Sequence, residues 1–129
     1  MLDKESLAYC VGGIALILVA VFFLFLFKKA VTRTLPLNQI IGLRTRNTMF
    51  SGDVWSSVHR RYAWIFLISS IGFIVSGLAL IAICAFPTSF WYLIKMFYGS
   101  LGIIFILIVA GGIKADKYAR SIIELSENR

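Results

Sequence analysis

The chain has 129 residues, of which 60% are hydrophobic and 15% are charged, and its formal net charge at pH 7 is +7. A soluble domain of this length lacks the interior to bury so much apolar surface, so the composition indicates one integral membrane domain over residues 1–129. The basic residues lie beside apolar runs, which favours anionic lipid headgroups over nucleic acid as their partner.

The first apolar run, residues 7–27, holds no charged residue over 21 positions. At a rise of about 1.5 Å per residue, a helix of this length spans a hydrocarbon core of roughly 30 Å. A signal peptide would have a shorter apolar stretch and a small-residue cleavage site, whereas Lys28 and Lys29 follow directly here. We therefore expect a retained transmembrane helix.

A basic connector follows this run. Its Lys and Arg residues are Lys28, Lys29, Arg33, Arg44, Arg46, Arg60 and Arg61, and its one acid is Asp53. The segment is long for a structureless loop, so we expect it to be structured. Ser51 or Asp53 can cap a helix, which we expect to run straight into the next membrane crossing. Trp55 and His59 are four residues apart and would share one face of that helix.

The second apolar run, residues 62–94, has 33 uncharged positions and is too long for one crossing. Pro87 in the segment "AFPTSF" predicts a tight turn within it. We predict helices at residues 62–86 and 91–113, with Lys95 reaching outward to the headgroups and the tail 114–129 continuing the last helix. The predicted fold is an all-α membrane protein with three transmembrane helices, 7–27, 62–86 and 91–113.

The distribution of Lys and Arg predicts the orientation in the membrane. The connector and the tail carry most of the basic residues, whereas the other side has Lys4 and Lys95. By the positive-inside rule, the connector and the C-terminus face the cytoplasm, and the N-terminus and the Pro87 turn lie outside.

Catalytic signatures are missing from the sequence. The lone histidine, His59, has no Cys or acidic residues at metal-ligand spacing, and no P-loop or Gly-x-Ser-x-Gly elbow is present. The predicted crossings contain no carboxylate, which a proton-coupled transporter would need. We expect neither an enzyme nor a metal or cofactor site.

Small residues recur at helical spacing on the second predicted crossing, at Ser69, Gly72, Ser76 and Ala79. Such a face typically allows close helix packing, within the chain or between copies in a homo-oligomer. A groove that accepts a foreign transmembrane peptide is the alternative.

The connector carries an ordered set of residues, which are Asn38, Ile41, Gly42, Arg44, Thr45, Thr48, Trp55 and His59. This order resembles the SdpI family of bacterial membrane proteins, known as immunity proteins against a secreted killing peptide. That family has an Asn followed by Ile-Gly-x-Arg-Thr, then a Thr, a Trp, and a His or Asn before a membrane helix. Longer relatives carry additional N-terminal membrane helices, so this chain corresponds to the short, three-helix form.

The resemblance implies an immunity protein of the bacterial cytoplasmic membrane that binds or blocks a membrane-active peptide or protein toxin in the bilayer. One alternative is a signalling or scaffold subunit that captures a cytoplasmic partner such as a repressor. Another is an oligomeric small transporter subunit. The motif residues either fix the connector against the helices or contact a ligand, lipid or partner directly.

Overall fold

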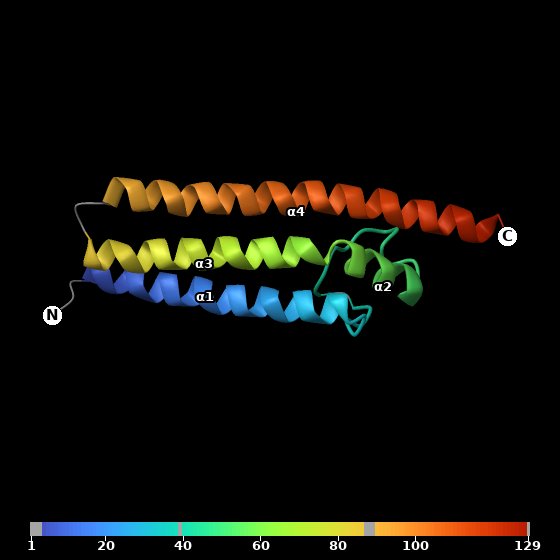
Figure 1. The fold of residues 1–129 in the computed structure, drawn as a ribbon, viewed down its shortest axis with the longest axis horizontal. Coiled ribbons are helices and arrows are strands. Elements are labelled where there is room, and N and C mark those ends of the chain that lie inside the picture. The colour runs from blue at the N-terminus through green and yellow to red at the C-terminus, as the bar shows by residue number, and fades with distance from the viewer. Residues whose placement is uncertain (1–3, 39, 87–89, 129) are drawn as a thin grey trace.

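The computed structural model describes residues 4–38, 40–86 and 90–128, and these contain four helices and no strand. The helices are α1 (Lys4–Val31), α2 (Gly52–Arg61), α3 (Ala63–Ala85) and α4 (Phe90–Glu127) (Figure 1). Helices α1, α3 and α4 are long and apolar enough to cross a membrane. The predicted all-α fold with three crossings is therefore confirmed, and the chain is a multi-pass membrane protein.

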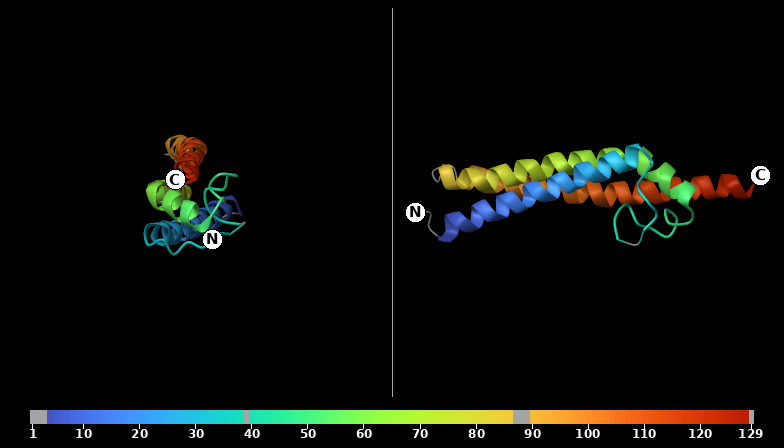
Figure 2. Two further views of the ribbon diagram at one scale, coloured as in Figure 1. Left: turned by 90° about the vertical axis from the view of Figure 1, so that its right-hand side faces the viewer. Right: turned by 90° about the horizontal axis from the view of Figure 1, so that it is seen from below.

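Helix α3 lies between α1 and α4 along its whole length (Figures 1 and 2). It packs against both, whereas the backbones of α1 and α4 do not contact each other within the described residues. The described residues 28–38, 40–62 and 114–128 gather at one end of the molecule, which we call the connector end. The start of α1, the end of α3 and the start of α4 form the opposite, or far, end (Figure 1).

Glycines bring α1 and α3 close together. A Cβ atom on Gly13 would lie 2.6 Å from the carbonyl oxygen of Gly77, and one on Gly77 would lie 2.7 Å from that of Gly13. The Ser70 hydroxyl also donates to the Ala20 carbonyl oxygen across this interface, at 2.8 Å. Small residues and interhelical hydrogen bonds of this kind hold helices together in lipid, where hydrophobic burial supplies little driving force.

The small-residue face of α3 lies against α4. A Cβ on Gly72 would lie 2.7 Å from the Ile104 side chain, and the Ser76 and Ser100 hydroxyls hydrogen-bond to each other. Ser69 and Ala79, the other two members of this face, are also buried. Helix α4 thus covers Ser76 and packs against Gly72, which still lines a small crevice of about 270 Å³ between α3 and α4.

The connector helix differs from its prediction at one end. Helix α2 begins as expected after Ser51, whose hydroxyl accepts the Val54 N–H at 3.2 Å. It does not run straight into α3, because the helix is interrupted at Tyr62, where φ is −103° and ψ is 15°. The prediction of one continuous helix was therefore wrong. The interruption turns α2 out of line with α3 (Figure 1), and the Tyr62 hydroxyl donates to the Lys114 carbonyl oxygen of α4 at 3.1 Å.

Helix α4 extends to Glu127, which confirms that the tail continues the last crossing. The predicted turn at Pro87 lies outside the described residues.

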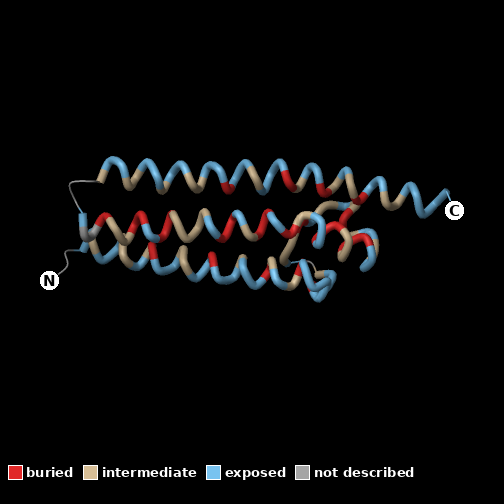
Figure 3. Tube along the Cα trace, in the orientation of Figure 1, coloured by how far each residue is buried: buried red, intermediate tan, exposed pale blue. Residues whose placement is uncertain are grey.

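Buried side chains concentrate around α2 and along α3, whereas α1 and α4 are exposed over most of their outer faces (Figure 3). The core at the connector end is apolar, and every helix contributes to it, as does the connector loop between α1 and α2. Its members are Leu26, Ala30, Leu35, Leu43, Val54, Trp55, Val58, Ala63, Ile65, Phe66, Ala115 and Ala119. His59 of the motif is buried against two members of this core, Trp55 and Phe66.

Candidate functional site in the connector

Asn38 shapes the first bend of the connector. Its side-chain oxygen accepts the N–H groups of Ile40 and Ile41 at 2.9 and 2.7 Å, and its side-chain nitrogen donates to the Pro36 carbonyl oxygen at 2.8 Å. An Asn side chain that binds the backbone two and three residues ahead mimics a backbone turn. Asn38 therefore starts the loop by a local mechanism.

Gly42 lets the loop pass directly over α2. Its φ angle of +119° lies in a region that favours glycine, and a Cβ there would be 2.5 Å from Nε2 of His59 and 2.9 Å from the Trp55 ring. No larger residue fits this position without displacing one of the two rings.

His59 is fully buried, and both of its ring nitrogens are engaged. Nε2 accepts the Leu43 N–H at 2.9 Å, so the ring proton must lie on Nδ1, which donates to the Trp55 carbonyl oxygen at 2.8 Å. Burial lowers the pKa of His59 below its usual 6.5, although the bond to Trp55 opposes this shift. The arrangement requires a neutral imidazole, which acts here as a brace for the loop backbone.

Trp55 ties the start of the connector to α2. Its indole Nε1–H donates to the Leu35 carbonyl oxygen at 3.1 Å, and its ring packs against the His59 ring with centroids 3.9 Å apart. The predicted common face of Trp55 and His59 is thus turned into the core, where the two rings bind the connector backbone at Leu35 and at Leu43.

Thr45 and Thr48 close a tight turn in the middle of the connector. The Thr48 hydroxyl accepts the Thr45 N–H at 2.8 Å and lies 2.8 Å from the Leu43 carbonyl oxygen, to which it can donate. The Thr48 N–H in turn donates to the Thr45 hydroxyl at 3.2 Å. Thr48 is fully buried, so these bonds satisfy polar groups that water cannot reach.

Asn47 and Asp116 join the loop to α4, and the sequence offered no indication of this pair. The Asn47 side-chain nitrogen donates to both carboxylate oxygens of Asp116, at 3.1 and 3.0 Å. The two residues are 69 positions apart, so no local spacing signals the contact. A lone acid placed among the basic residues after the apolar run is the one sequence feature that singles out Asp116.

Arg44 differs from the other motif residues. Its side chain is exposed, and the ion pair found among the described residues joins Arg120 to Glu124, so Arg44 does not pair with Asp53. Ile41, by contrast, is half-buried and lines a crevice of about 230 Å³ together with Gly42, Leu43 and residues of α1 and α3. The motif thus consists of residues that fix the conformation of the loop and one arginine whose side chain is exposed on its surface.

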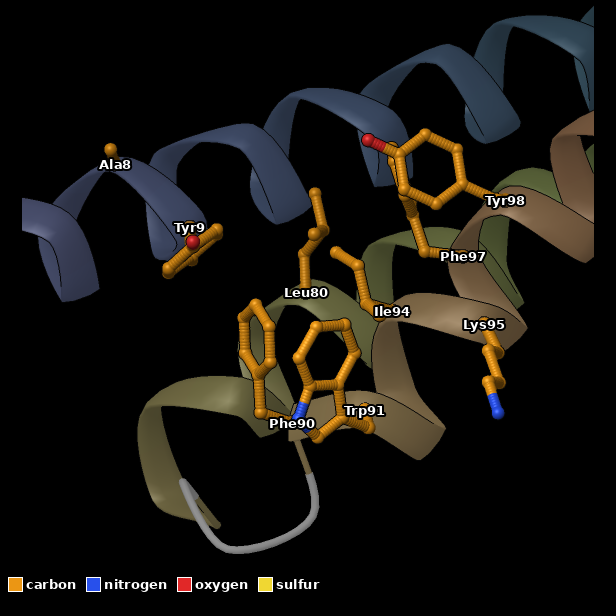
Figure 4. Close-up of a pocket in the computed structure, with 9 residues that line it drawn as sticks. All are labelled: Ala8, Tyr9, Leu80, Phe90, Trp91, Ile94, Lys95, Phe97 and Tyr98. Atoms are coloured by element: carbon orange, nitrogen blue, oxygen red, sulfur yellow. The ribbon is translucent and has the colours of Figure 1, made fainter.

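A larger cavity lies at the far end. It has a volume of about 880 Å³, and its lining comes from the start of α1, the end of α3 and the start of α4: Ala8, Tyr9, Leu80, Phe90, Trp91, Ile94, Lys95, Phe97 and Tyr98 (Figure 4). Tyr9 and Phe90 meet edge to face across it, with ring centroids 6.4 Å apart. The ammonium of Lys95 points away from the aromatic side chains (Figure 4), so the cavity itself is mainly apolar.

Comparison with known proteins gives one family. The sequence model of the SdpI/YfhL protein family matches residues 34–113, a range that holds the whole connector motif, α2, α3 and the apolar part of α4. No curated protein and no solved structure matches the chain.

Proposed function

Because this chain belongs to the SdpI/YfhL protein family, we propose that it is an immunity protein of the bacterial cytoplasmic membrane. It would protect the cell against a membrane-active peptide or protein toxin. The observation that supports this proposal is the family match over residues 34–113, together with the complete motif from Asn38 to His59 within it.

The proposed orientation places the connector end in the cytoplasm and the far end outside. Exposed basic side chains gather at the connector end, at Lys28, Arg33, Arg44, Arg46, Arg60, Arg61, Lys114, Lys117 and Arg120. Basic residues that flank membrane helices stay preferentially on the cytoplasmic side and attract anionic headgroups. A toxin that arrives from outside would therefore meet the far end first.

The cavity at the far end is the surface that best suits contact with the toxin. Its wall of Tyr9, Phe90 and Trp91 can receive the apolar side chains of a membrane-active peptide. The face around Gly72 and Ser76 is a poorer candidate, because Ser76 is buried against α4 and the crevice beside Gly72 measures only about 270 Å³. In this mechanism the connector cluster keeps α1 and α4 in place relative to α3, and the far end captures or blocks the toxin in the bilayer.

A protection assay tests the proposal. The chain is expressed in a sensitive bacterium, which is then challenged with the toxin encoded beside the gene, and survival is compared with that of an empty-vector strain. Ala8→Phe, which fills the cavity, should reduce protection, whereas Ala15→Phe, an exposed site on the same helix outside the cavity, should not. Unchanged killing despite verified insertion of the wild-type chain in the membrane would contradict the immunity function.

The exposed side chain of Arg44 supports a second candidate function, that of a signalling subunit that binds a cytoplasmic protein. An exposed arginine on a rigid loop is well placed to bind a carboxylate or phosphate of a soluble partner. Affinity purification of the tagged chain tests this alternative. A captured cytoplasmic protein that is lost with Arg44→Ala but retained with Ala8→Phe would favour signalling over protection at the far end.

A further inference from the structure

A second groove lies at the connector end, between the connector loop and α4. It has a volume of about 470 Å³, and its lining residues are Thr45, Ile108, Val109, Gly112, Ile113, Asp116 and Lys117. One part of this groove is apolar and the other carries charge, which distinguishes it from the mainly apolar cavity at the far end.

The apolar part runs along one face of α4. Ile108, Val109 and Ile113 are exposed by 37, 47 and 56%, and a Cβ on Gly112 would point into open space. Because Gly112 has no side chain, the groove is unobstructed at this position. From Ile108 to Asp116 the helix rises about 12 Å, which is long enough to bind part of an acyl chain.

The polar part presents both signs of charge on neighbouring residues. The Asp116 carboxylate is held in place by the two hydrogen bonds from Asn47, and Thr45 of the connector lies beside it. Lys117 is exposed at the same end of the groove. Arg120, one turn further on, lies 3.5 Å from Glu124, and its positive charge also acts on the Asp116 carboxylate.

The depth of the groove in the membrane follows from the position of Lys114, which ends the apolar run of α4. Ile108 and Ile113 precede it and lie in the hydrocarbon layer, whereas Asp116 and Lys117 follow it and reach the headgroup layer. The change from apolar to charged lining thus coincides with the boundary between acyl chains and headgroups.

We propose that this groove binds a zwitterionic aminophospholipid of the phosphatidylethanolamine class. Lys117 binds the lipid phosphate, Asp116 accepts hydrogen bonds from the lipid ammonium, and an acyl chain lies over Gly112 along Ile108 and Ile113. The fixed carboxylate of Asp116 repels a purely anionic headgroup. A choline headgroup has the positive charge but lacks the N–H donors that Asp116 would bind.

Lipid titration of the purified full-length chain in detergent, read by native mass spectrometry, tests the site. Phosphatidylethanolamine, phosphatidylcholine and phosphatidylglycerol with identical acyl chains serve as probes. We expect phosphatidylethanolamine to bind about fivefold more tightly than the other two, the ratio that roughly one surface charge contact supplies. Equal affinity for the three lipids would overturn the proposal.

Variants separate the two parts of the groove. Asp116→Asn should abolish the preference for phosphatidylethanolamine over phosphatidylglycerol, and Lys117→Gln should weaken the binding of both. Gly112→Leu, which fills the groove and leaves the Asn47–Asp116 contact untouched, should weaken every lipid. Gly102→Leu is the matched control, because a Cβ on this glycine of α4 also meets open space and it lies outside the groove. If Gly112→Leu and Gly102→Leu bind phosphatidylethanolamine equally well, the groove is not the site, even if Asp116→Asn disturbs the connector.

Discussion

At the connector end, all four helices meet around a buried tryptophan and histidine, whereas at the far end α1 and α4 flank α3 and leave a cavity of about 880 Å³ beside it. Two backbone groups of the connector are satisfied by side chains distant in sequence, in the bonds of His59 to Leu43 and of Trp55 to Leu35. The far end presents exposed aromatic rings such as Trp91 and Tyr98. One end is thus built to hold a single conformation, and the other offers an apolar surface that another molecule can cover. Substitutions should therefore affect stability strongly at the connector end and function selectively at the far end.

The largest effect on stability is expected for Gly42→Ala. The new Cβ would be strained at φ +119° and would clash with the rings of His59 and Trp55. Strain and overpacking together should lower the free energy of unfolding by about 2–5 kcal/mol. Thermal unfolding in mild detergent measures this loss. Gly52→Ala is the control, since a Cβ there meets no atom within 4 Å, and a similar stability of the two variants would show that the connector is not a rigid element.

His59→Phe should have the next largest effect. It keeps an aromatic ring beside Trp55 but leaves the buried Leu43 N–H without an acceptor. An unsatisfied buried donor costs about 1–3 kcal/mol, so the unfolding midpoint in denaturant should fall. Arg60→Gln, at the neighbouring exposed position of α2, should leave the midpoint unchanged. Equal midpoints for the two variants would mean that His59 does not support the loop.

A dependence of stability on pH follows from the same histidine. Because its pKa in the folded chain lies below the usual 6.5, the stability it contributes is complete above pH 6.5 and is lost as the pH falls toward the folded-state pKa. Protonation of Nε2 removes the acceptor of the Leu43 N–H. Between the usual pKa and the folded-state pKa the loss should approach about 1.4 kcal/mol per pH unit. Melting curves between roughly pH 7.5 and 5.5 check this, and the slope should disappear in His59→Phe, since His59 is the one histidine of the chain.

The smallest effect on stability is expected at the far end. Ala8 is exposed at the edge of the cavity, so Ala8→Phe should change the free energy of unfolding by less than about 0.5 kcal/mol while it reduces protection against the toxin. Melting curves of Ala8→Phe and Ala15→Phe, measured alongside the survival assay, separate the two readouts. If variants at the far end lose protection only when they also lose stability, the far end does not have a functional role separate from the stability of the fold.

The sequence predicted the helices better than it predicted their contacts. Runs without charge and the length needed to cross a bilayer determine α1, α3 and α4, and the hydroxyl of Ser51 was a recognisable cap for α2. The interruption at Tyr62 was missed because no glycine or proline marks it in the sequence. Beyond this break α2 packs against α1 and α4, and these contacts between distant segments are visible only in three dimensions.

The candidate site was predicted as a set of residues without their roles. The resemblance singled out Asn38, Gly42, Thr48 and His59, but neither composition nor spacing reveals that His59 must bind the Leu43 backbone. The contact between Asn47 and Asp116 joins residues far apart in the chain, so no local pattern could predict it or the groove beside it. The residue types of the motif thus identified the site. Only the tertiary contacts show that Arg44 is exposed on the loop, whereas the other motif residues fix its conformation.

The lack of direct backbone contact between α1 and α4 has a consequence for how a ligand reaches the cavity at the far end. Where their backbones stay apart, α1 and α4 are bridged by side chains such as Tyr9 and Phe90, and this seam between the two helices faces the acyl chains. A molecule dissolved in the bilayer can enter through this seam by two-dimensional diffusion, without returning to water. Its occupancy of the cavity would then follow its mole fraction among the lipids rather than its concentration in solution, so a sparingly soluble peptide could saturate the site once it has partitioned into the membrane.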